Sequence, residues 1–287
     1  LEQYDLKVIS NLSLDVKPRE IVAIAGSSGS GKSLLAHAVM GILPENARLT
    51  GSITYKGEIL DQKKKEAFRG TRIALVPQSI AYLDPLMKVG KQVTGGDRGK
   101  EAEISKKEIF KRFHLDEKIE KYYPFQLSGG MARRVLVSTA VISDASLIIA
   151  DEPTPGLDLE MALEALKVFR ELADEGKAVV LITHDIDLAF HIADRIAVFY
   201  AGTTVEMTRA EDFLEGVGKL RHPYSKALWQ ALPQNGFRPI PGFQPYARYL
   251  PKGCLFSPRC PHKTKECEND IPMSEIRGGY VRCIHAT

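Results

Sequence analysis

Eight residues near the N-terminus have the types and spacing that bind phosphate. The stretch GSSGSGKS fits the pattern Gly-x-x-x-x-Gly-Lys-Ser. Glycines let the backbone curl so that its N–H groups point at phosphate oxygens. Lys32 would reach the β- and γ-phosphates of a nucleotide, and the Ser33 hydroxyl would ligate Mg²⁺. The residues expected to contact the nucleotide here are Gly26, Ser27, Ser28, Gly29, Ser30, Gly31, Lys32 and Ser33.

An acidic pair in the stretch LIIADEP is the second candidate for chemistry. Asp151 and Glu152 follow an apolar run, and two carboxylates at the end of a buried strand are costly unless a cation or water neutralises them. Mg²⁺ would neutralise Asp151, and Glu152 would then polarise the attacking water as a general base. The alternative is a solvated acidic pair at the end of a strand.

Short apolar runs predict the elements that position these residues. Residues 21–25, 147–150 and 178–182 are expected to be buried parallel strands, each followed by polar or glycine-rich residues, where ligands bind in open α/β sheets. Between the last two runs, apolar residues recur on one face of a helix that Gly176 ends. The alternation indicates an α/β fold. A strand before residues 26–33 and a helix after them favour a phosphate loop over a chance glycine-rich turn.

Two segments depart from this alternation. Residues 84–145 form a charged, helix-prone insertion, which we expect to be a helical subdomain carried on the sheet. After about residue 215 the composition changes, and LPQNGFRPIPGFQPYARYLPKG is rich in Pro and Gly, which predicts an extended wrap or linker. We therefore expect one domain at 1–215 and a C-terminal extension at 216–287.

Composition excludes several classes of protein. The net charge of +3 is too small to indicate a nucleic-acid partner. No apolar run approaches the roughly 20 residues that span a bilayer, and the charged first residues predict no signal peptide. All four cysteines follow residue 253, which fits a reducing compartment and one local cysteine site.

The stretch LSGGM resembles the signature motif of the ATP-binding subunits of ABC transporters. It precedes a helix-like run, so Ser128, Gly129 and Gly130 would offer a second anion-binding helix N-terminus. The resemblance implies a P-loop NTPase core of the ABC type with a mostly parallel sheet, a helical subdomain and Mg²⁺-dependent hydrolysis of ATP. It also implies a head-to-tail dimer in which ATP lies between one subunit's phosphate loop and the other's signature. The second subunit is a different chain, as is usual in this branch, or a second copy.

Other motifs of that family follow in the expected order. By resemblance, Gln78 in LVPQ ligates Mg²⁺ and senses the γ-phosphate, and His184 in LITHD contacts the γ-phosphate. Asp158 in PGLD is implied to reach across the dimer. Tyr4 lies where the family places an aromatic ring that stacks on adenine. Alternatively, Tyr4 is a surface tyrosine at a chain end, and His184 is a core or surface histidine.

The C-terminal region narrows the resemblance to one branch. Residues 221–233, with PGFQP and GCLFSPRCPHKTKEC, resemble the extension of oligopeptide, dipeptide and nickel importer ATPases. The signature ends in Met131 where Gln is commoner, a variant that the peptide-importer branch tolerates. The resemblance implies uptake of di- or oligopeptides or of nickel, free or chelated. The implied partners are two transmembrane permease subunits and an extracytoplasmic substrate-binding protein, with this subunit peripheral on the cytoplasmic face of the plasma membrane.

The four cysteines have the spacing C-x5-C-x6-C-x15-C, which is neither a zinc-finger nor a ferredoxin pattern. Four thiolates within a short Pro- and Gly-rich segment still favour a metal site. In related importer ATPases, four cysteines in this segment resemble the ligands of a [4Fe–4S] cluster, so we expect that cluster, with Zn²⁺ as the alternative. Without a metal, the four cysteines would be packed as small apolar residues or joined in adventitious disulfides. The implied ligands are Cys254, Cys260, Cys267 and Cys283.

An apolar stretch after Gln78 is the expected contact with the membrane subunits. Tyr82, Leu83, Leu86 and Met87 would offer that surface, unless they belong to the core.

Three rival functions are weaker. A soluble ABC-type ATPase not coupled to transport usually carries two cassettes in one chain or a long coiled coil, and a phosphate-loop GTPase or kinase leaves LSGGM unexplained. A non-catalytic subunit is disfavoured because Glu152 and His184 fill the catalytic positions.

Overall fold

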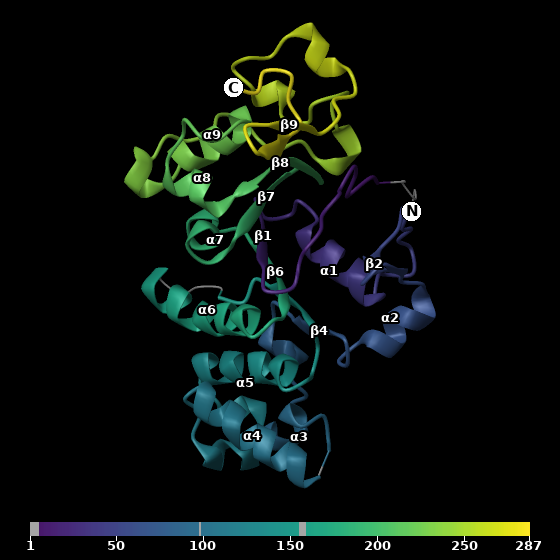
Figure 1. Cartoon of the computed structure of the whole chain (residues 1–287), viewed down its shortest axis with the longest axis vertical. Helices are drawn as coiled ribbons and strands as arrows, with labels where there is room; N and C mark the ends of the chain where they lie inside the picture. Colours follow the sequence, from purple (N-terminus) through teal and green to yellow (C-terminus); the bar gives the residue numbers. More distant parts are fainter. Residues whose placement is uncertain (1–5, 98, 155–158) are drawn as a thin grey trace.

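The computed structural model describes residues 6–97, 99–154 and 159–287 of the chain (Figure 1). These residues form one eight-stranded sheet in the order β4-β5-β6-β1-β7-β8-β10-β9. The five strands from β4 to β7 are parallel, and the remaining pairs are antiparallel. In sheet order the strands are Ile73–Val76, Leu147–Asp151, Ala178–Thr183, Ile21–Gly26, Arg195–Tyr200, Thr203–Arg209, Gly279–Val281 and Ser274–Ile276.

The three strands predicted from apolar runs are confirmed, because β1, β5 and β6 begin where the runs begin and extend one residue further. All residues of β1 and β6 are buried, as in parallel strands covered on both faces. Successive side chains on a strand point to opposite faces. Ile21, Ala23 and Ala25 therefore pack in one hydrophobic cluster, and Ile24 packs in the other. The α/β fold expected from the sequence is confirmed.

Helices cover both faces of the sheet. Ala36 and Met40 of α1 pack in the same cluster as Ile24, whereas Leu136 of α5 and Leu166 of α6 pack on the opposite face. Among the described residues, no helix has both the length and the apolar character that crossing a bilayer requires. The α-helices α1 to α9 are Lys32–Met40, Gln62–Phe68, Val89–Val93, Lys100–Arg112, Gly129–Val141, Leu159–Asp174, Ile186–Ile192, Ala210–Leu214 and Pro223–Gln230.

Short elements connect these layers. The strands β2 and β3 pair in a separate hairpin. They are Thr54–Tyr55 and Glu58–Ile59. The 3₁₀ helices η1 to η7 are Ile80–Tyr82, Glu117–Lys121, Pro124–Gln126, Pro233–Asn235, Ala247–Tyr249, Ser257–Arg259 and Lys265–Glu268.

The helix predicted between β5 and β6 is confirmed as α6. Ala162, Leu166, Phe169 and Ala173 are all buried, as their shared face requires. The chain leaves the helix through Gly176, whose φ of 109° is in the left-handed region, and its N–H donates to the Ala173 carbonyl at 2.9 Å. This is the glycine end expected from the sequence.

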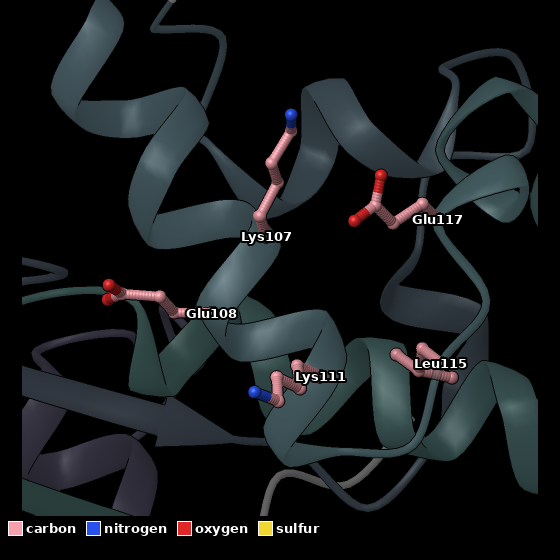
Figure 2. A pocket seen from close by; sticks show the side chains of 5 residues that line it. All are labelled: Lys107, Glu108, Lys111, Leu115 and Glu117. Carbon is pink, nitrogen blue, oxygen red and sulfur yellow. The ribbon is translucent and has the colours of Figure 1, made fainter.

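The charged insertion is helical, as predicted. Between β4 and β5 the chain forms α3, α4 and α5, which Figure 1 shows gathered at one end of the molecule. A hollow on this subdomain is lined by Lys107, Glu108, Lys111, Leu115 and Glu117 (Figure 2). Four of these five side chains are charged, and the hollow lies on the insertion rather than beside the phosphate loop. It is therefore separate from the phosphate site that the sequence predicts.

The C-terminal extension combines the expected wrap with regular elements on either side of it. Residues 232–253 form only the short turns η4 and η5 outside any α-helix, which confirms the prediction for that segment. Residues 223–230, however, form α9, and β10 pairs with β8 through Tyr280 opposite Met207. The expected boundary at 215/216 thus falls between parts of one sheet. Strands β8 and β10 are far apart in the sequence, so no local sequence pattern predicts that they pair.

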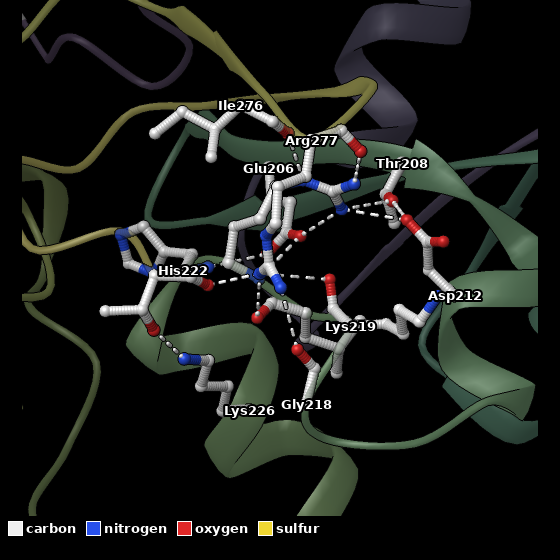
Figure 3. A network of polar contacts seen from close by, with 12 residues as sticks. Glu206, Thr208, Asp212, Gly218, Lys219, His222, Lys226, Ile276 and Arg277 are labelled. Carbon is white, nitrogen blue, oxygen red and sulfur yellow. Dashed lines mark hydrogen bonds and ion pairs between the residues drawn. The ribbon is translucent and has the colours of Figure 1, made fainter.

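A buried network of charges fastens the extension to the sheet (Figure 3). Arg221 forms ion pairs with Glu206 of β8 at 3.3 Å and with Asp212 of α8 at 2.8 Å. The guanidinium also donates to the Thr208 hydroxyl at 2.7 Å and to the carbonyls of Ile276 and Arg277. The guanidinium therefore links β8, α8 and the β9–β10 turn at once.

Candidate nucleotide site

The candidate residues gather at the carboxyl edge of four neighbouring parallel strands. β4 is followed by Gln78, β5 ends at Asp151 and Glu152 follows it, β6 is followed by His184, and β1 runs into the phosphate loop. Parallel strands deliver their carboxyl ends to one edge of a sheet, where α/β proteins bind ligands. The order β4-β5-β6-β1 therefore explains why residues more than a hundred positions apart can serve one site.

The phosphate loop has the backbone shape predicted from its glycines. A Cβ atom at Gly26 would lie 2.1 Å from the Phe199 carbonyl oxygen of the neighbouring β7, so only glycine fits there. Gly31 has a φ of 94° and directly precedes α1. The loop is thus closed against the sheet at its start and turned into a helix N-terminus at its end, where phosphate binds.

Lys32 is buried and folded back over the loop. Its Nζ donates to the carbonyl oxygens of Gly26 at 2.7 Å and Ser27 at 2.9 Å. Burial lowers the pKa of Lys32, and the nearby carboxylates of Glu152 and Asp151 oppose that shift. A partly desolvated ammonium held between loop carbonyls is suited to binding a phosphate anion.

Asp151 leaves a buried polar atom without a partner. Its Oδ1 is buried and has no hydrogen-bond partner, although the Ser33 side chain is hydrogen-bonded to this carboxyl group. Burial raises the pKa of Asp151, against the lowering effect of the Ser33 hydrogen bond. An orphaned carboxylate oxygen beside a hydroxyl is a fitting oxygen pair for Mg²⁺. The residues present therefore fit the metal expected from the sequence.

Glu152 and His184 are brought together by adjacent strands. His184 Nδ1 lies 2.7 Å from Glu152 Oε2, and since a carboxylate only accepts, we assign the proton to Nδ1. Glu152 is buried, whereas the His184 side chain is 55% exposed. Glu152 also has a φ of 47°, a backbone conformation that is costly for any residue other than glycine. Strain at a buried carboxylate of this kind is typical of functional sites.

The position of His184 follows from the turn after β6. The N–H of Asp185 donates to the Thr183 hydroxyl at 3.0 Å, and the Asp185 carboxylate accepts the N–H of Leu188 at 3.0 Å as the N-cap of α7. These bonds turn the chain sharply between β6 and α7 and leave the imidazole at the sheet edge.

Other predicted residues are placed but not brought to the loop. Gln78 is exposed two residues beyond β4. Ser128 is the N-cap of α5, accepting the N–H of Met131 at 3.3 Å, and is exposed together with Gly129 and Gly130. Among the described residues, no hydrogen bond joins these groups to residues 26–33. Tyr4 and Asp158 lie outside the described residues.

The expected contact surface after Gln78 is divided between surface and core. Tyr82 is 63% exposed and Leu86 is 86% exposed, as a docking surface requires. Leu83 is buried in the core, so the structural alternative applies to that residue, and Met87 is half-buried.

All four cysteines are free thiols. Burial raises the pKa of Cys283 to about 11, with smaller upward contributions from Cys254, Cys260 and Cys267. Their proximity agrees with one local cysteine site. However, within residues 6–97, 99–154 and 159–287, no group of three or more His, Cys, Asp or Glu side chains is placed to hold a metal ion. The structure therefore does not support the expected [4Fe–4S] cluster or its zinc alternative.

Two contacts to the phosphate loop were missed from the sequence. The Ser27 hydroxyl donates to Gln244 Oε1, and the Tyr224 hydroxyl is hydrogen-bonded to the Ser27 side chain. Both partners belong to the C-terminal extension, which the sequence predicted to be a separate region. No local pattern signals a contact between residues 217 positions apart.

Comparison with known proteins identifies the family. The family described as "ABC transporter" matches residues 9–155, and "Oligopeptide/dipeptide transporter, C-terminal region" matches residues 205–267. The chain is 36% identical to the oligopeptide transport ATP-binding protein OppD of Salmonella typhimurium, over 97% of this chain and 88% of that protein. It is 34% identical to the dipeptide transport ATP-binding protein DppD of Bacillus subtilis, over 95% of this chain and 86% of that protein.

A solved structure extends this likeness to the fold. A dimeric ATP-binding cassette, solved in a post-hydrolysis state with bound ADP and Pi, matches with a TM-score of 0.63 and 28% identity. The match covers 73% of this chain and 94% of that one. Together with the edge at which Lys32, Asp151, Glu152 and His184 meet, these likenesses show that the chain belongs to the ATP-binding proteins of the ABC transporter family and is an ABC-type ATPase.

Proposed function

We propose that this chain is the ATP-hydrolysing subunit of an importer for di- or oligopeptides, with its ATP site at the carboxyl edge of β4, β5, β6 and β1. One observation carries the site: a phosphate loop with a buried lysine lies beside an orphaned carboxylate oxygen and a strained Glu152–His184 pair. The peptide substrate is supported by the match of residues 205–267 and by the names of the relatives.

The residues divide the reaction between them. The loop amides and Lys32 bind the β- and γ-phosphates and stabilise the charge that develops on the γ-phosphate. Ser33, Asp151 and Gln78 would hold Mg²⁺, which would neutralise part of the phosphate charge when it is bound. Glu152 accepts a proton from the attacking water, and His184 orients that carboxylate through the 2.7 Å contact at Nδ1.

The signature turn supports a site completed by a second subunit. Ser128, Gly129 and Gly130 are exposed at the N-terminus of α5, where amide groups are free to bind an anion. We propose a head-to-tail dimer in which this turn covers the triphosphate bound to the partner subunit, with Asp158 reaching across and Tyr4 stacking on adenine. The partner is a related chain or a second copy.

The remaining partners follow from the proposed importer. Tyr82 and Leu86 form an exposed apolar pair on and beside η1, which we propose contacts one of two transmembrane permease subunits. A substrate-binding protein would deliver the peptide from outside the cell. The chain would then lie on the cytoplasmic face of the plasma membrane, with residues 1–215 acting as the ATPase and residues 216–287 as its extension.

Reconstitution of the complex tests this function. ATP hydrolysis by the complex, with its permease subunits and binding protein in vesicles, should rise when di- or oligopeptides are added. Ser128→Ala in every cassette should abolish the rise while each subunit still binds Mg·ATP, and Thr139→Ala on the same helix is the control. Stimulation by chelated nickel instead of peptides would reassign the substrate, and hydrolysis indifferent to any transported solute would indicate an ATPase not coupled to transport.

The metal at the four cysteines is retained only as a hypothesis. It draws on the proximity of the thiols, whereas their present arrangement argues against it. Anaerobic purification, followed by iron and zinc analysis and by visible absorption, tests whether the four cysteines bind a metal. A colourless, metal-free protein that hydrolyses ATP would refute the hypothesis of a bound metal.

A further inference from the structure

Residues of the C-terminal extension reach the phosphate loop at Ser27. Ser27 has one hydroxyl proton, which it donates to Gln244 Oε1, because a side-chain carbonyl oxygen only accepts. The Tyr224 hydroxyl also interacts with the Ser27 side chain, which lowers the pKa of Tyr224 against the raising effect of its burial. The side chain is therefore held from two directions by residues roughly 200 positions further along the chain.

Ser27 also determines where the loop lysine lies. Its carbonyl oxygen accepts Lys32 Nζ at 2.9 Å and the Ser30 hydroxyl at 2.8 Å. Fixing the Ser27 side chain thus fixes the backbone group that positions the ammonium. Ser27 is itself exposed on the loop.

Rigid packing holds Tyr224 in place. The ring is buried, with its centroid 4.5 Å from that of Tyr200 on β7 and 5.3 Å from that of Phe256. Tyr200 and Phe256 are also buried and pack edge to face at 5.3 Å. Burial raises the pKa of Tyr224 to about 12, so its hydroxyl remains a proton donor at physiological pH.

Arg259 holds the segment that carries Gln244. Its guanidinium donates to the carbonyls of Pro241 at 2.7 Å and Ile240 at 2.9 Å and lies over the rings of Tyr200 and Phe256. The chain that presents Gln244 is thereby tied to the same aromatic cluster that holds Tyr224.

We propose that Tyr224 and Gln244 are positioning residues of the phosphate loop, which hold Ser27, and through it Lys32, in the geometry that receives the triphosphate of ATP. This inference rests on the proposed ATP site. Preorganised groups bind more tightly because their ordering cost is met before the ligand arrives. A loop without these two contacts has the same ligands for ATP but must be ordered when ATP binds.

Binding of Mg·AMP-PNP to the full chain, measured by titration calorimetry, tests the proposal. Tyr224→Phe and Gln244→Met keep the size of each side chain and remove its hydrogen bond to Ser27. Each should weaken binding by about three- to tenfold, the usual worth of one hydrogen bond. Tyr246→Phe and Gln234→Ala, in the same extension, are the matched controls and should bind as the wild type does. Equal affinity in the wild type, Tyr224→Phe and Gln244→Met would overturn the proposal.

A double-mutant cycle separates positioning from a general loss of structure. If Gln244 acts through Ser27, then Gln244→Met has no further effect on affinity in a Ser27→Ala background. An undiminished effect in that background contradicts the proposal, even if the single variant binds weakly. In hydrolysis assays the variants should raise KM for ATP and leave kcat unchanged, because the same contact is made before and during the reaction. A wild-type chain that fails to bind Mg·AMP-PNP would instead refute the ATP site itself.

Discussion

Two buried clusters of charge in this chain differ in how completely their groups are paired. At the end of β5, Asp151 leaves Oδ1 buried and without a partner, and Glu152 has a positive φ. Beside β8, Arg221 pairs with Glu206 and Asp212 and donates to two backbone carbonyls. Both clusters bury carboxylates, but only the first leaves a carboxylate oxygen without a partner.

The difference separates a site from an anchor. A buried charge that lacks partners destabilises the protein, so its presence at a sheet edge indicates a ligand that supplies what is missing. A buried charge with all its partners stabilises a particular arrangement of chain segments, and its loss is felt as loss of stability. Changes at the first cluster should therefore alter chemistry, and changes at the second should alter folding.

Glu152→Gln gives the largest effect that this comparison predicts. The amide cannot accept a proton from water, so the rate of ATP hydrolysis should fall by at least about 100-fold. Mg·ATP should still bind, because no phosphate ligand is removed. Single-turnover hydrolysis and nucleotide binding, measured on the same sample, check this. Substantial hydrolysis in the variant would remove Glu152 from its role as general base.

Glu206→Gln should show the opposite behaviour. Glu206 Oε1 and Oε2 accept the backbone N–H groups of Arg221 and His222, and the amide would place a donor where an acceptor is required. Loss of one partner of a buried ion pair costs about 3 kcal/mol of unfolding free energy. Urea denaturation measures the loss, and the rate of hydrolysis per folded chain should not change. A stable variant would mean that the network does not anchor the extension.

His222 adds a pH dependence to the anchor. Burial lowers its pKa from 6.5 to about 3, so between these values the unfolded chain binds a proton that the folded chain does not. The contribution of His222 to the unfolding free energy is therefore fully present above pH 6.5 and is lost as the pH falls toward 3. Between pH 6.5 and 5 the expected loss is about 2 kcal/mol.

His222→Asn isolates this contribution. Asparagine can still accept the N–H of Tyr224 as the N-cap of α9, but it does not titrate. The unfolding free energy of the variant should depend less on pH over the same range, as measured by denaturation at a series of pH values. An unchanged slope would assign the acid sensitivity to other groups.

The sequence predicted the site better than it predicted the anchor. Each residue at the sheet edge follows an apolar strand within a short motif, so local pattern located Lys32, Asp151 and Glu152, and the family resemblance added His184. The anchor joins Glu206, Arg221 and the β9–β10 turn, whose pairing is set by packing between distant segments. The same limit hid the contacts of Ser27 with Tyr224 and Gln244, because serine, tyrosine and glutamine side chains carry no local signal of a partner so far along the chain.

The smallest expected effect is a gain in stability when Asp151 is neutralised. Asp151→Asn can still accept the Ser33 hydroxyl proton but removes a buried, incompletely paired charge, so without Mg²⁺ the unfolding free energy should rise by about 1 kcal/mol. The pKa of Asp151 is raised, so the destabilisation by its carboxylate is complete above that pKa and is lost as the pH falls to the ordinary value of 3.8, and the advantage of the variant should shrink over the same range. Asp212→Asn, which removes a paired carboxylate, is the matched control and should be less stable than the wild type. Thermal unfolding of both variants with and without Mg·ATP measures the effects, and Asp151→Asn should hydrolyse ATP poorly and gain less than the wild type from Mg·ATP. If the two variants shift stability in the same direction, the two clusters do not differ in the way their contacts indicate.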